Sequence, residues 1–339
     1  MQLSEFDFPF DPSLVASQPV MPRDQARLLV LDRRTHGFVH RRVADLPSLL
    51  NPGDLLVVND TKVLAARVSG IKQSTGTPVE VLFVRDLGDN RWEIMVKGTF
   101  RIGQVIEFDQ QSRATIVKRD ATGTEVVVDS PQSVTRLFEA RGVMPLPPYI
   151  KRAATQEDHQ WYQTVFAKHE GAIAAPTAGL HLTEDLFQRL NASGINVATV
   201  TLHVGPGTFK PVTTERIEDH QMGAEAFTIS EGTARVIQKT KQAGGRVVAV
   251  GTTVVRTLET VAKEKREIVP MSGESRLFIA PGFQFKVVDA LMTNFHLPRT
   301  TLLMLVSAFA GIEPVRKAYE EAVKERYRFY SYGDAMLII

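Results

Sequence analysis

The sequence predicts an α/β fold, a layered α/β domain with an inserted six-stranded antiparallel β-barrel domain. Beyond about residue 150, apolar strand-like segments alternate with amphipathic helical segments, a pattern typical of a largely parallel sheet covered by helices. Between residues 63 and 130, six short segments of alternating apolar and polar residues are separated by turn residues and show no helical period, which indicates a small barrel. We therefore assign residues 1–62 and 151–339 to a discontinuous α/β domain and residues 63–150 to the barrel domain.

Three strands are expected in the first 60 residues. Residues 27–33 and 38–43 form a predicted hairpin around the turn Arg34-Thr35-His36-Gly37. Residues 54–60 form a continuous apolar run, as in a strand buried on both faces of a parallel sheet. This third strand therefore belongs with the α/β domain rather than with the barrel.

A helix is predicted at residues 133–142, and the prolines of residues 144–150 mark the end of the barrel domain. Beyond that boundary, apolar segments that lead into a helix or a glycine loop are expected to be strands: residues 171–175, 195–204 and 246–251. The chain then continues through an apolar segment and an amphipathic segment to a terminal apolar stretch at residues 334–339.

Composition excludes several classes of chemistry. The 339 residues include no cysteine, which excludes disulfides, thiolate nucleophiles, cysteine-ligated zinc and iron–sulfur clusters. Forty Lys and Arg residues against 38 Asp and Glu leave a formal charge of +2, so any basic surface has to be local. The N-terminus lacks the basic start and apolar run of an export signal, and the longest apolar stretch, residues 302–310, is half of a membrane span. We expect a cytoplasmic protein that does not enter a membrane.

Polar residues gather where predicted strands run into helix starts, the position at which open α/β sheets bind ligands. In residues 174–187, Gly179 permits close backbone approach, and His181 stands just ahead of a helix that Thr183 caps. This histidine can act as a general base or orient a ribose hydroxyl, because its pKa lies close to neutrality. A histidine that is simply hydrogen-bonded into its loop explains the sequence equally well.

A second loop follows the predicted strand that ends near His203. Gly205 and Gly207 let a ligand approach the backbone, and Thr208 offers a hydroxyl. No third glycine opens a helix at the offset that dinucleotide binding requires, and a tight loop without a ligand is the simpler explanation.

A third loop opens a helix that Thr252 or Thr253 caps. Arg256 and Glu259 lie on one face of that helix, three residues apart. An arginine in the first turn after a strand faces the ligand crevice and can bind a carboxylate through two hydrogen bonds. A solvated ion pair on the helix surface is the alternative.

A fourth loop places Asn294 and His296 just before Pro298, at another helix start. A fifth group lies at the crossing from sheet to barrel, where a turn explains it equally well: Asn59, Asp60, Thr61, Lys62 and Arg67. Together the loops favour one composite site at a single edge of the sheet. None of the eight histidines has metal-ligand spacing and no phosphate-binding loop occurs, so we expect no metal site.

Long motifs in these segments resemble one family, the S-adenosylmethionine:tRNA ribosyltransferase-isomerases of queuosine biosynthesis. The similarity runs along essentially the whole chain. The motifs that carry it are RDQARLLVLDR (23–33), VVNDTKVLAAR (57–67), MPLPPYI (144–150), YQTVFA (162–167), AAPTAGLHLT (174–183), TLHVGPGTFKPV (201–212), VGTTVVRTLE (250–259), LFIAPGFQFKVVDALMTNFHLPRTTLLMLVSAFAG (277–311) and YRFYSYGDAMLI (327–338).

The resemblance implies an enzyme that transfers and isomerises the ribosyl moiety of S-adenosylmethionine onto 7-aminomethyl-7-deazaguanine at the wobble position of tRNA. Epoxyqueuosine-tRNA forms, and adenine and methionine are released. S-adenosylmethionine is then a co-substrate, and no prosthetic group is implied. The resemblance also implies a barrel inserted in an α/β domain. The family's motif positions fall on Asp60, Lys62, Thr177, Gly179, His181, His203, Gly205, Gly207, Thr208, Thr252, Thr253, Arg256, Glu259, Asn294, His296 and Asp334.

Among these positions we expect His181 to be the first proton-transfer residue, with Asp60 and His203 in support. Arg256 is expected to bind the methionine carboxylate. The remaining positions, together with Arg67, are expected to bind substrate, with the glycine loops close to adenosine.

Three positions depart from the family pattern. Leu182 stands where phenylalanine usually follows the histidine, and Trp161 stands where arginine is usual. Gly223 stands where a histidine is expected, so a catalytic role of that histidine cannot apply here. If this segment takes part in catalysis, Glu225 and His220 would have to carry that role.

Two alternatives remain open from the residues themselves. A non-catalytic tRNA-binding module would need a basic, aromatic-rich barrel, whereas residues 63–130 carry balanced charge and a single tryptophan. An S-adenosylmethionine methyltransferase would need a glycine-rich loop after the first strand, which the segment from Asp54 to Val63 lacks. The small net charge predicts that tRNA is bound through local contacts. We expect the chain to be a monomer.

Overall fold

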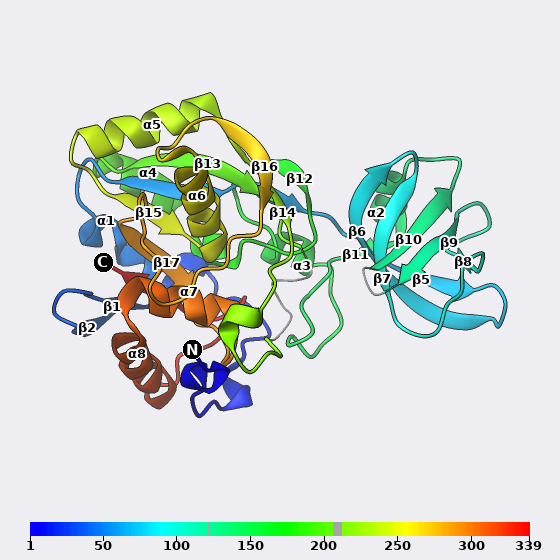
Figure 1. The fold of residues 1–339 in the computed structure, drawn as a ribbon, viewed down its shortest axis with the longest axis horizontal. Helices are drawn as coiled ribbons and strands as arrows, with labels where there is room; N and C mark the ends of the chain where they lie inside the picture. The colour runs from blue at the N-terminus through cyan, green and yellow to red at the C-terminus, as the bar shows by residue number, and fades with distance from the viewer. Residues whose placement is uncertain (121–122, 206–211) are drawn as a thin grey trace.

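The computed structural model describes residues 1–120, 123–205 and 212–339, arranged as an α/β part and a barrel that lie side by side (Figure 1). The α/β part is built on a nine-stranded sheet in the order β16-β14-β13-β3-β15-β17-β18-β1-β2. Its strands are β1 (Arg27–Leu31), β2 (Phe38–Arg42), β3 (Leu55–Asn59), β13 (Asn196–Leu202), β14 (Glu225–Ile229), β15 (Val247–Val250), β16 (Met271–Ser275), β17 (Ala290–Asn294) and β18 (Ala335–Ile338).

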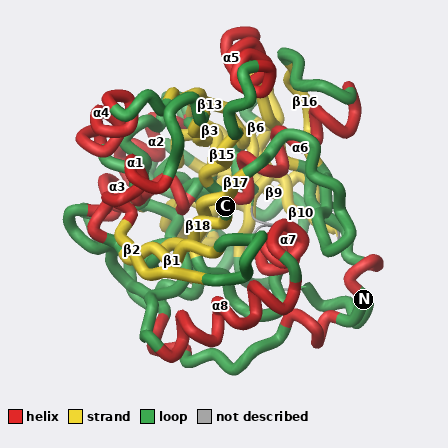
Figure 2. The backbone as a smooth tube through the Cα atoms, turned by 90° about the vertical axis from the view of Figure 1, so that its left-hand side faces the viewer, coloured by secondary structure: helices red, strands yellow, loops and turns green. Residues whose placement is uncertain are grey.

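Four central strands, β13, β3, β15 and β17, run parallel to one another. Every residue of β3 is buried, because helices cover both faces of the sheet. Leu55 and Val57 pack toward α5 (Glu231–Gln242), α6 (Thr252–Lys265), α7 (Thr301–Ala310) and α8 (Ile312–Lys324). Leu56 and Val58 pack toward α1 (Leu46–Leu49) and α4 (Glu184–Ala192), so the period of two along the strand divides the core into two layers (Figure 2).

The barrel closes through six antiparallel strands, because β5 pairs with both β6 and β8. These strands are β5 (Arg67–Lys72), β6 (Thr77–Gly88), β7 (Arg91–Val96), β8 (Val105–Glu107), β9 (Arg113–Asp120) and β10 (Gly123–Asp129). The short strand β11 (Gly142–Val143) adds to β5, and α2 (Val134–Arg141) covers one end. Phe138 of α2 meets Phe83 and Trp92 with ring centroids 5.1 and 5.5 Å away, which joins the helix to the barrel core.

The remaining elements lie outside these two sheets. Strands β4 (Thr61–Val63) and β12 (His169–Ala172) form a separate parallel pair. The other helices are α3 (Asp158–Trp161) and the short 3-10 helices η1 (Leu3–Phe6), η2 (Pro12–Leu14), η3 (Arg23–Gln25), η4 (Val43–Asp45), η5 (Thr177–His181) and η7 (Ile217–Asp219).

The predicted fold class is confirmed, and so is the hairpin of β1 and β2, which pair antiparallel. One strand differs from its prediction: the segment expected at residues 171–175 begins at His169 and pairs with β4 outside the main sheet. The barrel strands lie between Arg67 and Asp129, and we propose the domain boundaries at residues 62/63 and 150/151 on that basis. Within the three described ranges, no helix is both long and apolar enough to span a membrane.

Candidate functional site

The candidate site lies where the four parallel strands end. Asn59, the last residue of β3, ties this edge together: its Nδ2 donates to the carbonyl of Leu202 at 2.9 Å, and its Oδ1 accepts from the Leu202 N–H at 3.0 Å. A backbone hydrogen bond joins the exit of β15 to β17: the N–H of Gly251 donates to the carbonyl of Met292, two residues before the end of β17, at 2.8 Å. Neighbouring strand ends thus bring several of the predicted residues to one edge of the sheet.

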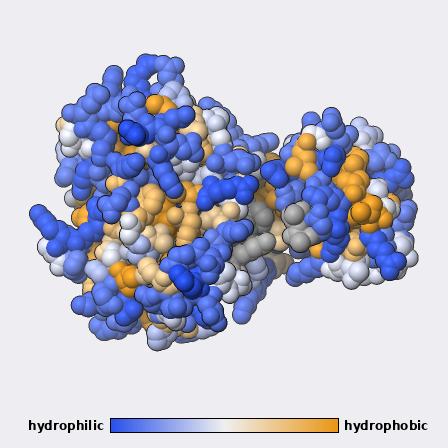
Figure 3. Space-filling model, in the orientation of Figure 1, coloured by the Kyte–Doolittle hydropathy of each residue, from blue (hydrophilic) through white to orange (hydrophobic). Residues whose placement is uncertain are grey.

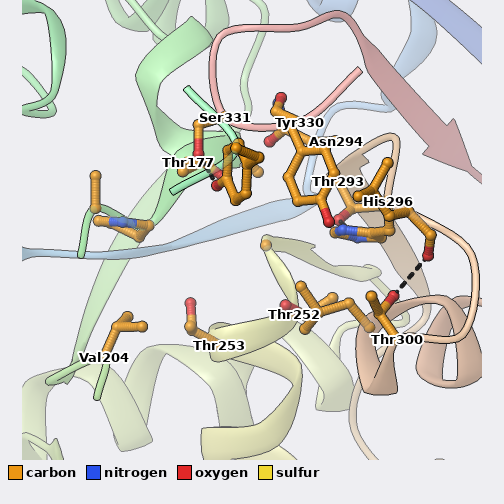
Figure 4. Close-up of a pocket in the computed structure, with 17 residues that line it drawn as sticks. Thr177, Val204, Thr252, Thr253, Thr293, Asn294, His296, Thr300, Tyr330 and Ser331 are labelled. Carbon is orange, nitrogen blue, oxygen red and sulfur yellow. Dashed lines mark hydrogen bonds between the residues drawn. The ribbon is translucent and has the colours of Figure 1, made fainter. Parts of the chain in front are cut away.

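A pocket of about 60 Å³ opens at this edge (Figure 4). Its wall is made of strand exits, helix starts and the loop before β18, and most of its polar groups are hydroxyls. It is lined by Tyr149, Ala175, Pro176, Thr177, Ala178, Val204, Gly251, Thr252, Thr253, Thr293, Asn294, His296, Leu297, Thr300, Leu302, Tyr330 and Ser331.

Asn294 is a buried amide in this wall, with 2% of its surface exposed. Its Nδ2 donates to the carbonyl of Tyr330 at 2.9 Å and lies 3.2 Å from Nε2 of His181. Its Oδ1 is buried and has no hydrogen-bond partner among the described residues. A buried acceptor without a donor destabilises the protein by about 1–3 kcal/mol, so this oxygen points to a ligand.

His181 lies behind Asn294 rather than in the pocket wall. Burial lowers the pKa of His181 to about 4, with smaller contributions from nearby charges, and the imidazole is therefore neutral near pH 7. Because its Nε2 accepts the Asn294 amide, the proton sits on Nδ1. His181 therefore contacts the pocket through Asn294.

His296 is also buried, and burial lowers its pKa to about 3. Its Nε2 lies 3.0 Å from the hydroxyl of Thr293, and its backbone N–H donates to the hydroxyl of Tyr319 at 3.0 Å. A neutral imidazole fixed in this way presents a rigid polar wall to the pocket.

Two tyrosines that the sequence reasoning missed form an aromatic side of the pocket. Tyr149 and Tyr330 pack with ring centroids 3.8 Å apart, and the Tyr149 hydroxyl lies 2.6 Å from Oγ of Ser331. Asp334 holds this loop in place by accepting the backbone N–H of Arg328 at 2.8 Å. The sequence predicts only a domain boundary at the proline-rich segment that contains Tyr149. Long-range packing brings this segment to the pocket. The one sequence signal for both tyrosines was their place within the motifs shared with the family.

Helix α6 begins in the pocket wall. Gly251, its N-cap, has a φ of 95° and no side chain with which to accept the first N–H groups of the helix. Thr252 and Thr253 supply the first turn, so their N–H groups and hydroxyls face a site that favours anions.

Arg256 and Glu259, one and two turns further along, are engaged inside the protein. The Arg256 guanidinium forms a buried ion pair with Glu225, and its Nε donates to the carbonyl of Leu277 at 3.2 Å. Glu259 accepts the backbone N–H groups of residues 286–288 at 2.9–3.0 Å. Neither side chain lines the pocket, so the structure does not bring them together with the other predicted substrate-binding residues.

A second, larger cavity of about 680 Å³ lies between the barrel and the α/β part, and Val204 lines both cavities. The barrel contributes Phe83, Arg85 and Trp92. The α/β part contributes His203, together with Glu170, Gly171, Ile173, Gly205, Met222, Gly223, Ala224, Glu225, Ala226, Glu274 and Arg276. We call this cavity the cleft. In the view of Figure 3, hydrophilic residues cover most of the surface, and apolar ones gather in patches on both the α/β part and the barrel.

His203 and Asp60 form a polar cluster beside the cleft. The His203 Nδ1 lies 2.8 Å from the hydroxyl of Thr61, and Asp60 accepts a hydrogen bond from Thr201 at 2.6 Å. Burial, and then the neighbouring His169, lower the pKa of His203, while Asp60 raises it. Gly171 packs so close that an added Cβ would stand 2.9 Å from the His203 ring, which only glycine avoids.

The other predicted residues lie at varying distances from the pocket. Thr177 lines it, whereas Gly179 packs against Phe166, whose ring an added Cβ would approach to 2.9 Å. Lys62 pairs with Glu170 at 2.9 Å on the surface. Arg67 donates to the carbonyl of Leu146 at 3.0 Å. Gly207 and Thr208 lie outside the described residues.

The three departures from the family pattern fall in different surroundings. Leu182 is fully buried in the layer beneath α4, and Trp161 packs against a small apolar cluster. Gly223 lines the cleft with no atom within 4 Å of an added Cβ, so a larger side chain at this position would project into open space.

A family model described as queuosine biosynthesis protein matches residues 3–338. This chain belongs to that family. The S-adenosylmethionine:tRNA ribosyltransferase-isomerases of Desulforamulus reducens and Staphylococcus haemolyticus are 48% and 45% identical to it, over the whole of both chains. The crystal structure of S-adenosylmethionine tRNA ribosyltransferase from Thermotoga maritima is 39% identical, covers 99% of this chain and 100% of its own, and superposes with a TM-score of 0.59. The family resemblance inferred from the motifs is confirmed.

Among the residues with described positions, no group of three histidine, aspartate or glutamate side chains is placed to hold a metal ion. The polar groups that line the pocket and the cleft are hydroxyls, imidazoles, carboxylates, guanidinium groups and one side-chain amide. Such groups can bind a zwitterion, stack on a base and move protons.

Proposed function

We propose that this queuosine biosynthesis protein transfers and isomerises the ribosyl moiety of S-adenosylmethionine onto 7-aminomethyl-7-deazaguanine at the wobble position of tRNA. The products are epoxyqueuosine-tRNA, adenine and methionine. Membership of the family over residues 3–338 and the names of full-length relatives support this reaction. The structural observation that carries it is the pair of cavities, about 60 and 680 Å³, which share Val204.

The two cavities suit two substrates that have to meet. The pocket is too small for the whole of S-adenosylmethionine, so the rest of that molecule extends past Val204 toward the cleft. The cleft is large enough for a base turned out of the anticodon loop, and Trp92, which is 8% exposed, offers aromatic surface in it. The reacting ribose then lies at the boundary between the two.

Acid–base chemistry in this reaction needs a group that removes a proton next to the sulfonium or from the attacking aminomethyl group. His203 lines the cleft, and its lowered pKa keeps it neutral and able to accept that proton near pH 7. Asp60 supports the same cluster. His181, which the sequence placed first in proton transfer, is proposed to act on the pocket by positioning Asn294, because its Nε2 accepts from that amide.

The substrates also define the partners and the location. Thr177, Thr252, Thr253, Asn294 and His296 are proposed to contact S-adenosylmethionine, since they line the pocket. We propose that the enzyme acts as a monomer in the cytoplasm, where it meets tRNA, and that it needs no prosthetic group.

The test is to incubate the protein with S-adenosylmethionine and tRNA that carries the aminomethyl-deazaguanine, and to measure released adenine. Adenine and methionine are expected in equal amounts, and tRNA with guanine at the wobble position serves as the control without the accepting amine. S-adenosylhomocysteine without adenine would overturn the proposal in favour of methyl transfer. Binding of tRNA without any turnover would favour a binding module.

A further inference from the structure

The amide of Asn294 can adopt only one orientation. Its nearest acceptor is the carbonyl of Tyr330, 2.9 Å from Nδ2, and a carbonyl oxygen cannot donate. If the amide were turned over, Oδ1 would face that carbonyl oxygen and the interaction would become repulsive. Both hydrogens of Nδ2 are thus committed, one to Tyr330 and one to His181.

This orientation leaves Oδ1 of Asn294 as a fixed acceptor. The oxygen is buried and has no donor in the described part of the chain, although Asn294 lines the pocket. Because Asn294 lines the pocket, a molecule bound there can supply the missing donor. A positively charged donor gains most, because hydrogen bonds to charged groups are stronger than those between neutral groups.

The exit of the neighbouring strand β15, where α6 begins, favours the opposite charge, an anion. Gly251 leaves β15 with its N–H donating to Met292, two residues before Asn294, so the start of α6 and Asn294 stand on adjacent strand ends. The first N–H groups of α6, at Thr252 and Thr253, attract an anion. A cation acceptor and an anion site therefore lie side by side.

The size of the pocket matches a small zwitterion. A water-sized group needs roughly 10–15 Å³, so a pocket of about 60 Å³ holds about five such groups. An α-amino-acid head group has a similar number of non-hydrogen atoms. Arg256, the residue expected from sequence to bind the carboxylate, is committed to Glu225 and does not line the pocket.

We infer that this pocket is an amino-acid subsite, in which Oδ1 of Asn294 accepts the α-ammonium of the methionine moiety and the start of α6 binds its α-carboxylate. The inference rests on the proposed function, because it assigns one end of S-adenosylmethionine to the pocket. It also gives His181 a positioning role: its Nε2 and the Tyr330 carbonyl hold the amide so that the oxygen meets the ammonium. The sulfonium and ribose then lie beyond the pocket, toward Val204 and the cleft.

The experiment compares the dissociation constants of three ligands for the full-length protein, measured by calorimetry. The ligands are S-adenosylmethionine, its analogue with hydrogen in place of the α-amino group, and its decarboxylated analogue. We expect the wild-type protein to bind the analogue without the amino group about ten- to a hundredfold more weakly than S-adenosylmethionine. The decarboxylated analogue is expected to lose a similar factor.

The variant Asn294→Leu removes the acceptor while keeping a side chain of similar size. In this variant the amino and deamino ligands are expected to bind within about threefold of each other. Asn191→Leu is the matched control: Asn191 is exposed near the end of α4 and does not line the pocket, so the variant is expected to retain the wild-type discrimination. Thermal unfolding checks that each variant is folded.

Discrimination below about threefold in the wild-type protein, or undiminished discrimination in Asn294→Leu, would overturn the inference. If Asn294→Leu does not fold, the wild-type ligand series still decides it. Failure of the proposed function looks different: adenine release would be absent while the methionine head group could still be discriminated. Adenine release without any discrimination would overturn only the amino-acid subsite.

Discussion

Burial sets the protonation state of the histidines at this sheet edge. The pKa values of His181 and His296 are lowered to about 4 and about 3, because each imidazole lies fully inside the protein. His203 is only partly buried, and burial lowers its pKa as well. All three are therefore neutral near pH 7, and only His203 combines a neutral ring with a position on the cleft.

The pH dependence of turnover should report His203. Its lowered pKa means that the neutral, proton-accepting form persists below the ordinary value of 6.5 and is lost only at more acidic pH. We expect kcat/KM to be flat near pH 7 and to fall on an acidic limb below pH 6.5. His203→Gln should lower kcat by about 10²–10⁴-fold and abolish that limb.

The measurement is adenine release across pH 5–8 for both proteins. His220→Gln is a suitable comparison, because His220 packs against Phe278, with ring centroids 5.7 Å apart, and does not line the cleft. An acidic limb that survives unchanged in His203→Gln would assign the proton transfer to another group.

At the scale of elements, one buried ion pair connects helix α6 to strand β14. Arg256 and Glu225 are each about 5% exposed, and the other Glu225 oxygen accepts the N–H of Gly205 at 3.0 Å. The pair thereby links the helix that opens in the pocket to the loop that follows β13. A buried charge whose partner is removed costs about 3–5 kcal/mol.

Arg256→Met should therefore lower the free energy of unfolding by about 3–5 kcal/mol, as measured by denaturant titration. The double variant Arg256→Met/Glu225→Gln should be less destabilised than the single one, because glutamine removes the unpaired charge and keeps an acceptor for Gly205. If Arg256 instead served only to bind the methionine carboxylate, Arg256→Met would keep its stability and lose affinity for S-adenosylmethionine.

The elements themselves follow from local patterns, whereas their long-range partners do not. The alternation of strands and helices and the six barrel segments were predicted from periodicity, and so was the gathering of Asn59, Asn294 and Thr252 at one edge. The pairing of β4 with β12 joins residues more than a hundred positions apart, and no local pattern encodes it. Tyr149 reaches the pocket for the same reason, through packing on Tyr330.

Hydrogen bonding also separates residues that sequence patterns group together. Arg256 and Glu259 look equivalent on their helix, yet one pairs with Glu225 and the other caps the backbone at residues 286–288. Their partners come from distant segments of the chain. The sequence could therefore place these side chains near the sheet edge, but it could not show whether they bind a ligand or pair inside the protein.

At the scale of the whole molecule, the cleft is bounded by both parts of the chain. Arg85 of the barrel lies 3.8 Å from Glu274 of β16, an exposed ion pair that crosses it. The charged residues lining the cleft are of both signs, including Asp86, Glu93 and Arg276. A surface of mixed charge with aromatic groups suits recognition of a base rather than of a run of phosphates.

Trp92 can report whether the anticodon enters this cleft. It lines the cleft, is 8% exposed, and packs on Phe83 and Phe138. The only other tryptophan is Trp161, so Trp161→Phe leaves a single fluorophore. An anticodon stem-loop carrying the aminomethyl-deazaguanine is expected to change the Trp92 emission, because a base stacked in the cleft alters its surroundings.

The titration is read against fluorescence anisotropy of a dye on the same RNA, which reports binding anywhere on the protein. Matching midpoints from the two signals place the RNA at the cleft. The exposed arginines of edge strand β2, Arg41 and Arg42, offer a competing basic surface. Binding there would raise the anisotropy while the Trp92 emission stays constant, and Arg41→Ala/Arg42→Ala would then weaken the RNA affinity and reduce its salt dependence.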